Sequence, residues 1–279
     1  MSSGQDGMIV VKLGGAALDG GIDPVLDAIA SLASTRPVVL VHGGGRTVDD
    51  LLGRLGVISR RIDGLRVTTE EEIDIVAGVL GGTVNKRLVG GLIRRGSRAV
   101  GLCLSDGGEL LTERLMHPSG DLGRVGRIGA AEPGRRVELV TLLLERGYLP
   151  VLSSIGMDER GELHNVNADD AASALAGVLG ASALLLLTDV DGIRGANGGV
   201  IETIDQGGIE LLIEQGVIEG GMIPKARGAA EAAERSGSDV IIASWRSDET
   251  LRSLGTGSIG GTRVTAAANS AKQKTEAGR

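Results

Sequence analysis

The 279-residue chain contains no phenylalanine, one tryptophan and one tyrosine, so aromatic residues make up only 1% of it. Its core must therefore be built from aliphatic side chains, and hydrophobic residues do reach 42%. The lack of aromatic rings argues against binding of single-stranded nucleic acid, which relies on bases stacking on such rings. A net charge of −7 also removes the electrostatic attraction that draws proteins to DNA or to anionic membranes.

Cysteine and histidine are almost as scarce. Cys103 is the only cysteine, so no intrachain disulfide can form, in keeping with a reducing cytoplasm. His117 and His164 have no metal-ligand spacing with each other or with Cys103, which argues against a zinc site. The first seven residues, MSSGQDG, lack the basic and apolar regions of a signal peptide. The apolar runs are far shorter than the roughly 20 residues of a membrane helix, so we expect a cytoplasmic protein.

Lysine is scarce among the charged residues, with five lysines against 24 arginines. Lys272 and Lys274 lie in the polar C-terminal segment, whereas Lys12 and Lys225 each adjoin a double glycine, in VVKLGG and GGMIPK. A lysine ammonium is a compact point charge on a flexible stem, so it can follow a phosphate whose charge moves during reaction; arginine is a planar fork. Phosphoryl transfer is therefore the first hypothesis.

Strand-like and helix-like segments alternate along the chain. The strand-like runs are continuous and aliphatic, which is typical of strands buried on both faces of a parallel sheet. The clearest helical pattern begins at the capping-box pair Thr69 and Glu72 and ends near Gly96. The alternation predicts an α/β protein with a mainly parallel central sheet and helices on both faces. The expected strands are Ile9–Leu13, Val38–His42, Ala99–Cys103, Leu149–Leu152, Leu184–Thr188 and Val240–Ala243, and the further helices are Asp169–Leu179, Ile209–Gln215 and Lys225–Ser236.

Distinctive loops follow several of these strands, and ligands of open parallel sheets bind beyond the carboxyl ends of the strands. At Gly43–Gly45, consecutive glycines let backbone N–H groups approach an anion at a helix N-terminus; the alternative is a tight turn without a ligand. Thr188–Gly192 place carboxylates where they can organise a nucleotide or Mg²⁺, although the same residues form ordinary turns. Asn165–Asp170 combine two asparagines and two aspartates, more than one helix cap requires.

The sequence lacks the motifs that several other kinds of site require. HGGG also forms an oxyanion hole in esterases, but these need a G-x-S-x-G elbow, and no serine in the chain has glycines two residues before and after it. The glycine loop fits neither the Walker A nor the Rossmann fingerprint. Arg66 has two competing interpretations: it can clamp a carboxylate bidentately, or it can lie on the surface. His42, which directly precedes the glycine loop, is predicted to be structural.

Together these segments resemble the amino acid kinase family. The matches occur in family order over residues 8–264, and GLRVT combined with NVNAD points to the members that phosphorylate N-acetyl-L-glutamate. The SSIG and IASWR segments look most like the short, arginine-insensitive, homodimeric form. The matching segments are VVKLGG (Val10–Gly15), VHGGG (Val41–Gly45), GLRVT (Gly64–Thr68), VNK (Val84–Lys86), LPVLSSIG (Leu149–Gly156), NVNAD (Asn165–Asp169), TDVDGI (Thr188–Ile193) and GGMIPK (Gly220–Lys225).

The resemblance implies a three-layer α/β/α sandwich, the amino acid kinase fold. Residues 8–175 are expected to form an N-terminal lobe for the acyl substrate, and residues 176–264 a C-terminal lobe for the nucleotide. Residues 1–7 and 265–279 are expected to be disordered. A homodimer is expected to form through the helix that begins at Thr69 and ends at about Arg95.

The implied reaction is ATP-dependent phosphorylation of the γ-carboxylate of N-acetyl-L-glutamate, the second step of arginine biosynthesis. Mg²⁺ is expected to bridge the ATP phosphates, with no metal site made by the protein. A glutamate carboxyl titrates near about 4.3, so it is already ionised and needs no general base. The difficulty is the approach of an anion to a polyanion, which positioned cations and N–H donors relieve.

The resemblance also assigns roles to single residues. Lys12 and Lys225 would stabilise the transferring phosphoryl group, and Asp169 would hold both lysines in place as an organiser. Lys86 is left with a structural or interface role. The substrate-binding residues would be Gly44, Gly45, Arg66 and Asn165, and the nucleotide-binding residues would be Gly15, Asp189, Val190, Asp191, Gly192, Ile193, Arg194, Val217, Ile218 and Glu219.

Two alternatives stay open. One is a kinase of a related acylated amino acid, such as N-succinylglutamate or an amino acid linked to a carrier protein. The other is a non-catalytic module that senses a nucleotide or an amino acid. The presence of Lys12, Asp169 and Lys225 argues against the second alternative.

Overall fold

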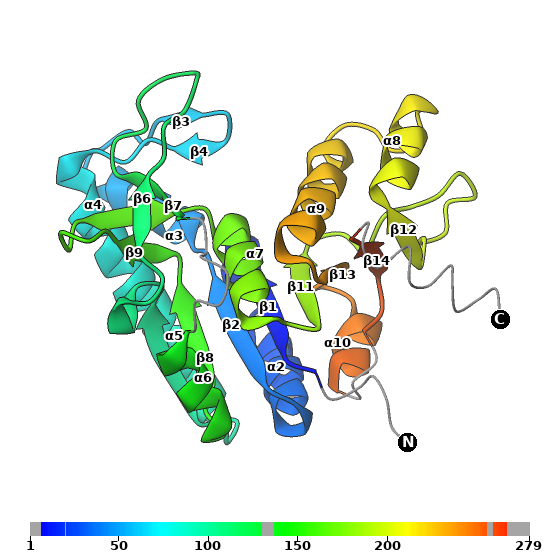
Figure 1. Cartoon of the computed structure of the whole chain (residues 1–279), viewed down its shortest axis with the longest axis horizontal. Coiled ribbons are helices and arrows are strands. Elements are labelled where there is room, and N and C mark those ends of the chain that lie inside the picture. The colour runs from blue at the N-terminus through cyan, green and yellow to red at the C-terminus, as the bar shows by residue number, and fades with distance from the viewer. Residues whose placement is uncertain (1–6, 20, 130–136, 256–258, 267–279) are drawn as a thin grey trace.

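The computed structural model describes residues 7–19, 21–129, 137–255 and 259–266. Its centre is an eight-stranded sheet with the strand order β12-β14-β13-β11-β1-β2-β8-β5 (Figure 1). All neighbouring strands run parallel except β13 and β14, so the predicted mainly parallel sheet is confirmed. The strands are β1 (Ile9–Leu13), β2 (Val38–His42), β5 (Ala99–Cys103), β8 (Leu149–Ser153), β11 (Ala183–Thr188), β12 (Thr203–Asp205), β13 (Asp239–Ser244) and β14 (Thr262–Thr265).

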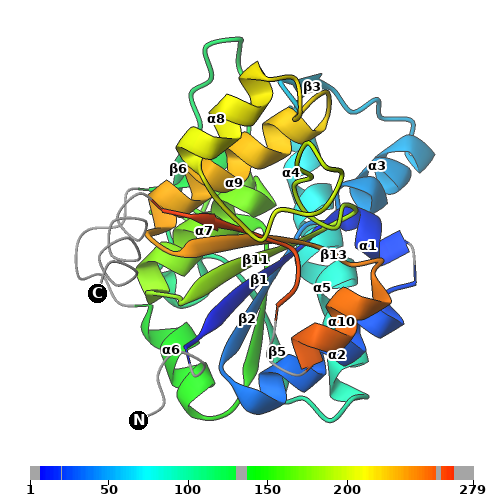
Figure 2. The ribbon, with the colours of Figure 1, turned by 90° about the vertical axis from the view of Figure 1, so that its right-hand side faces the viewer.

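Helices cover both faces of this sheet, which makes the predicted three-layer α/β/α sandwich (Figure 2). Each face has its own aliphatic core, and the strands contribute to both: Val11 of β1 packs into one core and Val10 into the other. One layer holds α1 (Gly15–Asp19), α2 (Asp23–Thr35), α3 (Gly45–Arg54), α4 (Glu70–Ala77), α5 (Asn85–Ile93) and α10 (Asp248–Gly255); the other holds α6 (Glu138–Glu145), α7 (Ala168–Leu179), α8 (Gln206–Glu214) and α9 (Met222–Ser236).

The long helix expected from Thr69 forms in three parts, because a π-helical segment, η1 (Gly78–Val84), separates α4 from α5. The capping box between Thr69 and Glu72 is present at its start, as predicted. The expected helical segment is therefore present, but its π-helical middle was not predicted, because period alone does not reveal the wider turn. Inside η1, Gly81 packs so closely on Cys103 of β5 that a Cβ would lie 3.1 Å from its sulfur. Wide turns of this kind are frequent at functional sites.

Short strands lie beside α3 and α4, away from α8 and α9 (Figure 1). They form a four-stranded sheet with the order β6-β7-β10-β9 and a two-stranded hairpin, β3–β4. The sequence Asp158–Leu163, in which Gly161 separates two short extended stretches, predicts a hairpin tip, and β9 and β10 do pair antiparallel around it. The other short strands were not predicted, because runs of two to four residues carry too little periodic signal. The bounds of all these strands are β3 (Arg61–Ile62), β4 (Leu65–Arg66), β6 (Thr112–Arg114), β7 (Val125–Ile128), β9 (Ile155–Met157) and β10 (Leu163–Val166), with a 3₁₀ turn, η2 (Asp106–Gly108), before β6.

The ends of several elements differ from the prediction by a few residues. Helix α9 begins at Met222, before the expected start at Lys225, so Lys225 lies within its first turn. Strand β14 ends at Thr265, one residue beyond the expected domain end. The segments predicted to be disordered lie outside the described residues, apart from Gly7, Thr265 and Ala266. Among the described residues, no helix is long and apolar enough to cross a membrane.

Candidate active site

Lys12 and Asp169 meet at the centre of the sheet. Lys12 lies on β1, and its Nζ is 2.9 Å from Oδ1 and 3.0 Å from Oδ2 of Asp169. Asp169 belongs to the first turn of α7, which Asn167 caps: its Oδ1 accepts the backbone N–H of Asp169 at 2.8 Å and that of Asp170 at 3.3 Å. One of the two asparagines in the NVNADD segment is thus the helix cap, and it fixes the turn from which Asp169 reaches Lys12.

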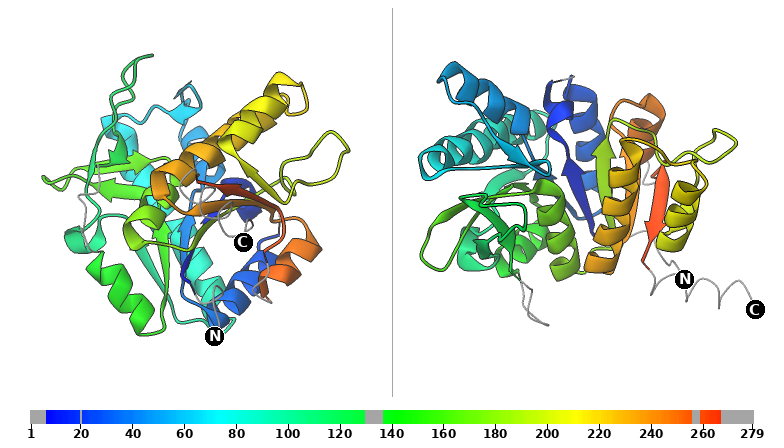
Figure 3. Two further views of the ribbon diagram at one scale, coloured as in Figure 1. Left: turned by 45° about the vertical axis from the view of Figure 1, so that its right-hand side comes forward. Right: turned by 90° about the horizontal axis from the view of Figure 1, so that it is seen from above.

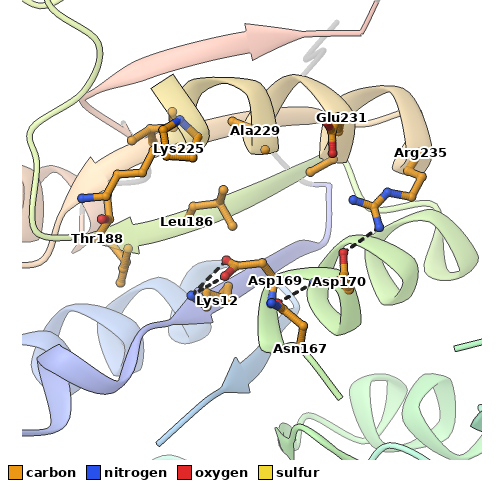
Figure 4. A pocket seen from close by; sticks show the side chains of 15 residues that line it. Lys12, Asn167, Asp169, Asp170, Leu186, Thr188, Lys225, Ala229, Glu231 and Arg235 are labelled. Atoms are coloured by element: carbon orange, nitrogen blue, oxygen red, sulfur yellow. Dashed lines mark hydrogen bonds and ion pairs between the residues drawn. The ribbon is translucent and has the colours of Figure 1, made fainter. Parts of the chain in front are cut away.

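The second predicted lysine has a different partner. Lys225 Nζ lies 2.5 Å from Oδ1 of Asp189, the residue that follows β11. The hydrogen bond from Lys225 lowers the pKa of the Asp189 carboxyl. The expectation that Asp169 holds both lysines is therefore not met in this structure. Lys12 approaches Asp169 from β1, whereas Lys225 projects from α9 toward the end of β11 (Figure 4).

A cavity of about 400 Å³ lies between α7 and α9 and contains both lysines (Figure 4). Asp169 and Asp170 line one wall, Lys225 and other residues of α9 line the opposite wall, and Leu186 of β11 lies between them. Lysine ammonium groups at two ends of one space can contact a phosphate chain along its length. The two lysines and Asp169 were predicted from the sequence, whereas the positions of α7 and α9 as the walls were not.

A second cavity, of about 200 Å³, contains all four residues predicted to bind the acyl substrate. Gly15, predicted to contact the phosphates, lines this cavity and not the larger one. Asp169 and Asn167 line both cavities, so the two spaces meet at the first turn of α7. The predicted substrate residues found here are Gly44, Gly45, Arg66 and Asn165.

The glycine loop after β2 is closely packed on both sides. A Cβ on Gly44 would lie 2.9 Å from a methyl carbon of Leu80, so a larger residue there would have to displace the Leu80 side chain of η1. A Cβ on Gly15 would lie 3.4 Å from the nitrogen of Gly45, which shows how near the two glycine loops are. Helix α3 begins at Gly45, and the first N–H groups of a helix have no intrahelical partner. The loop therefore offers anion-binding donors to the smaller cavity.

Arg66 is buried and held in a fixed orientation, so it is not the surface arginine of the alternative interpretation. It donates to Oδ1 of Asp49 at 2.5 Å, to the carbonyl oxygen of Gly45 at 2.8 Å and to the hydroxyl of Ser59. Arg61 donates to Oδ2 of the same Asp49 at 2.9 Å. Burial raises the pKa of Asp49, but the hydrogen bonds and charges of the two guanidinium groups outweigh it and lower that pKa overall.

Arg61 and Asp49 are site residues that the sequence analysis missed, although a signal for Arg61 exists. Asp63 and Gly64 both have positive φ, +49° and +84°, and an Asp-Gly pair is a strong hairpin signal. In that hairpin Arg61 pairs directly with Arg66. Asn165, on β10, completes this side of the cavity and donates to the hydroxyl of Thr68 at 3.1 Å.

His42 lines neither of the two cavities and instead supports the glycine loop through a contact with Gly43. Its Nδ1 lies 2.8 Å from the carbonyl oxygen of Gly43, and its Nε2 lies 3.1 Å from Nδ2 of Asn85. Burial lowers the pKa of His42 to about 4, so the imidazole is neutral. Asn85 also donates to the carbonyl oxygen of Val151 at 2.9 Å, and Lys86 donates to Oδ1 of Asn85 at 3.1 Å. These contacts agree with the structural roles predicted for His42 and Lys86.

Most of the predicted nucleotide-binding residues lie apart from the 400 Å³ cavity, in the loops after β11 and before α9. Ile193 and Ile218 are buried in the core, so only their backbone is available to a ligand. Gly192 lies so close to Thr262 that a Cβ would be 2.6 Å from its hydroxyl oxygen. In the part of the chain that the structure describes, the ion pair between this group and a predicted catalytic residue joins Asp189 to Lys225. The residues concerned are Asp189, Val190, Asp191, Gly192, Ile193, Arg194, Val217, Ile218 and Glu219.

Lysines held by carboxylates beside glycine loops, at the carboxyl edge of a parallel α/β/α sandwich, define a phosphotransferase site. Residues 7–244 match the model of the amino acid kinase family, and the chain belongs to that family. A relative from Aeromonas salmonicida (strain A449), described as acetylglutamate kinase, is 44% identical over 263 residues, which cover 92% of this chain and 98% of the relative.

Solved structures give the same fold. The structure of smu.665 from Streptococcus mutans UA159 is 29% identical, with a TM-score of 0.70, over 93% of this chain and 98% of that chain. N-acetylglutamate synthase from Neisseria gonorrhoeae, complexed with coenzyme A and N-acetyl-glutamate, has a TM-score of 0.77 at 24% identity, over 93% of this chain and 59% of that one. At that identity the second likeness concerns the fold alone.

Proposed function

We propose that the protein is a cytoplasmic kinase that transfers the γ-phosphoryl group of ATP to the γ-carboxylate of N-acetyl-L-glutamate, giving N-acetyl-L-glutamyl 5-phosphate in arginine biosynthesis. The relative from Aeromonas salmonicida supports this proposal. The observation that carries it is the meeting of two cavities at Asp169. One contains the four residues assigned to the acyl substrate, and the other contains both lysines assigned to the phosphoryl group.

The chemistry needs electrostatic stabilisation and no base. The attacking carboxylate is ionised at neutral pH, because a glutamate side chain titrates near about 4.3. As its oxygen forms a bond to the γ-phosphorus, the bond from that phosphorus to the β,γ-bridging oxygen breaks, and ADP leaves. Lys12 and the N–H groups around Gly44 and Gly45 offset charge on the attacking side, and Lys225 offsets charge on the nucleotide side.

The two carboxylate–lysine pairs would then behave differently during the reaction. Asp169 contacts Lys12 through both oxygens and lies where the cavities meet, so it keeps Lys12 in position. Lys225 is held by one oxygen of the partly exposed Asp189. We infer that Lys225 turns from Asp189 to the phosphates when ATP binds.

The charges around Arg66 suit a substrate with a second carboxylate. Arg61 and Arg66 carry two positive charges, and Asp49 carries one negative charge between them. One positive charge is left beside the 200 Å³ cavity, which also contains Asn165. The α-carboxylate of an N-acylated glutamate matches this charge. The cavity is smaller than the ~300–1,000 Å³ usual for drug-sized ligands, which favours a small acyl group.

We propose that Mg²⁺ enters as part of the Mg·ATP substrate. Among the described residues, no group of three or more His, Cys, Asp or Glu side chains is placed to hold a metal ion by itself. Mg²⁺ commonly binds through substrate phosphates and one or two carboxylates. Asp169 and Asp189 have suitable carboxylate oxygens, and the ion would supply neutralisation of phosphate charge.

A hydroxamate assay tests the proposed reaction. Purified protein is incubated with Mg·ATP and N-acetyl-L-glutamate, and hydroxylamine traps the acyl phosphate. We expect trapped product together with ADP. Turnover of N-succinylglutamate or a carrier-linked amino acid, with none of N-acetyl-L-glutamate, would replace the proposed substrate. ATP binding without ADP release for any of these acids would favour a sensing module.

We also propose a homodimer formed through α4, η1 and α5. Strand β5 is at the end of the sheet and all of its residues are only half-buried. Ile93 on α5 is 55% exposed and Leu142 on α6 is 50% exposed. Sedimentation of the wild-type protein is expected to show a dimer and that of Ile93→Asp a larger monomer fraction. A wild-type protein that sediments only as a monomer contradicts the proposal.

A further inference from the structure

Helices α7 and α9 lie side by side on one face of the sheet and form the walls of the 400 Å³ cavity (Figures 3 and 4). The two helices are in close contact with each other next to this cavity. The buried hydroxyl of Ser173 donates to the carbonyl oxygen of Ala232 at 3.2 Å. A Cβ on Gly177 would lie 3.2 Å from the Cα of Ser236, so only a small residue allows this approach. The two helices therefore have a fixed register, and a shift of one displaces the other.

An ion pair at the end of the cavity joins the same two helices. Arg235, in the last turn of α9, lies 2.7 Å from Oδ1 of Asp170, in the first turn of α7 (Figure 4). Asp170 is the neighbour of Asp169, and Asn167 accepts hydrogen bonds from the N–H groups of both aspartates. Any force that Arg235 exerts on Asp170 therefore acts on the turn from which Asp169 holds Lys12.

The ion pair also completes the anchoring of α9. Lys225, in the first turn, is paired with Asp189, and Arg235 is ten residues further along, about 15 Å away on an α-helix. Each end of α9 is thus tied to a carboxylate on a different element, and the helix spans the cavity between the two ties. Arg235 itself lines the cavity but contacts neither Lys12 nor Lys225 among the described contacts.

We propose that Arg235 is a positioning residue for phosphoryl transfer: through Asp170 it fixes the first turn of α7 relative to α9, and so the spacing between Lys12 and Lys225. This inference rests on the proposed function. An ion pair whose side chains are 51% and 43% exposed adds little to stability. Its effect on rate can still be large, because a displacement of 1 Å at a reacting centre can cost about 10²-fold.

The chain offers a matched control on the same helix. Arg227 of α9 is paired with Glu210 of α8 at 2.6 Å, with exposures of 49% and 39%. This pair has the same chemistry and similar exposure, but it does not connect α9 to α7. Arg235→Gln and Arg227→Gln therefore remove equivalent charges, and only the first loosens the contact between the cavity walls.

The test compares kcat and KM of the two variants with the wild type, using Mg·ATP and N-acetyl-L-glutamate. We expect Arg235→Gln to lower kcat about 10-fold with KM for the acid nearly unchanged, within the ~10²-fold range of small displacements. Arg227→Gln is expected to keep the wild-type kcat. The charge-exchanged double variant Asp170→Arg with Arg235→Asp is expected to recover part of the lost kcat. Equal kcat for both single variants, or no recovery, overturns the inference.

A second readout does not depend on the substrate being correct. The rate at which acetic anhydride modifies Lys12, followed by mass spectrometry, reports how firmly Asp169 holds this lysine. We expect faster modification in Arg235→Gln than in the wild type, and no change in Arg227→Gln. If the wild-type protein fails to phosphorylate N-acetyl-L-glutamate, the proposed function is wrong, while the labelling still decides the role of Arg235. Unchanged labelling in Arg235→Gln contradicts that role.

Discussion

The ammonium group of Lys225 lies 2.5 Å from Asp189, and that of Lys12 lies 2.9 Å from Asp169, so each lysine of the site has a carboxylate of its own. Asp169 is at the junction of the two cavities, and Asp189 is at the end of β11. The two carboxylates are therefore expected to differ in their importance for the reaction.

Asp169→Asn is expected to lower kcat by about 10²–10³-fold, the usual effect of losing one preorganised electrostatic group. The KM values change little, because the group acts on the transition state. Asp189→Asn removes the charge of the resting partner of Lys225 but keeps a side-chain oxygen that can contact the nucleotide or Mg²⁺. We therefore expect a kcat loss of at most about 10-fold, less than the loss of one preorganised electrostatic group. Steady-state kinetics of both variants measures these kcat values. Equal losses of kcat would show that Asp169 is no more important for the reaction than Asp189.

Arg66→Lys is expected to raise KM for N-acetyl-L-glutamate at least about 10-fold, since a bidentate guanidinium contact is not replaced by an ammonium. The kcat value at saturating acid is expected to remain within a few-fold of wild type. Arg60→Lys, at an exposed position before the same hairpin, is the matched control and leaves KM unchanged. A large kcat loss without a change in KM would instead place Arg66 at the phosphoryl group.

Because His42 is buried and neutral, the protein is expected to lose stability in acid. Its pKa is about 4 in the folded protein and about 6.5 when exposed, so its contribution is complete above pH 6.5. As the pH falls from 6.5 toward 4, the unfolded chain binds a proton that the folded chain does not, and up to about 3 kcal/mol of stability is lost. Urea denaturation at pH 7 and pH 4.5 measures this loss. His42→Asn is expected to show a flatter dependence on pH, and parallel curves would refute this origin.

Gly101 and Gly90 form a contrasting pair for measuring packing. A Cβ on Gly101 would lie 1.9 Å from Oδ1 of Asn85 and 2.6 Å from Nζ of Lys86, whereas nothing lies within 4 Å of a Cβ on Gly90. We expect Gly101→Ala to lower the free energy of unfolding by about 2 kcal/mol or more, as overpacking does. Gly90→Ala, in α5, is expected to raise it by about 0.5–1 kcal/mol, since alanine favours a helix. Thermal or urea unfolding checks both values.

The mainly parallel sheet and the two helix layers could be predicted because each long strand is a continuous aliphatic run. Val38–His42 and Ile9–Leu13 appear in the structure with the predicted bounds. The strands Arg61–Ile62 and Leu65–Arg66 were missed because they have only two residues each. Their positions depend on the Asp63–Gly64 turn, a signal of local backbone geometry and not of hydrophobic period.

The site residues divide in the same way, into those marked by a local sequence pattern and those whose contacts depend on how distant segments pack. Lys12, Gly44 and Asn165 lie in loops or strand ends whose sequence pattern is local, and the structure places all three on cavities. The partner of Lys225 could not be predicted, because the choice between Asp169 and Asp189 depends on how α9 packs against β11. Asp49 was missed for a similar reason: its contact with Arg66 joins α3 to a hairpin 17 residues away.

The π-helical segment Gly78–Val84 holds one residue more than an α-helical path of the same number of turns would. Deleting one residue there would allow an unbroken α-helix, which has better intrinsic hydrogen bonding. The residues beyond the deletion would stay on nearly the same face of the helix, so Asn85 would keep its contacts with His42 and Val151. The change would fall on the wide turn itself, whose Leu80 and Val84 side chains close over Gly44. The extra residue therefore shapes the wall of the glycine loop and is not needed to connect the two helices.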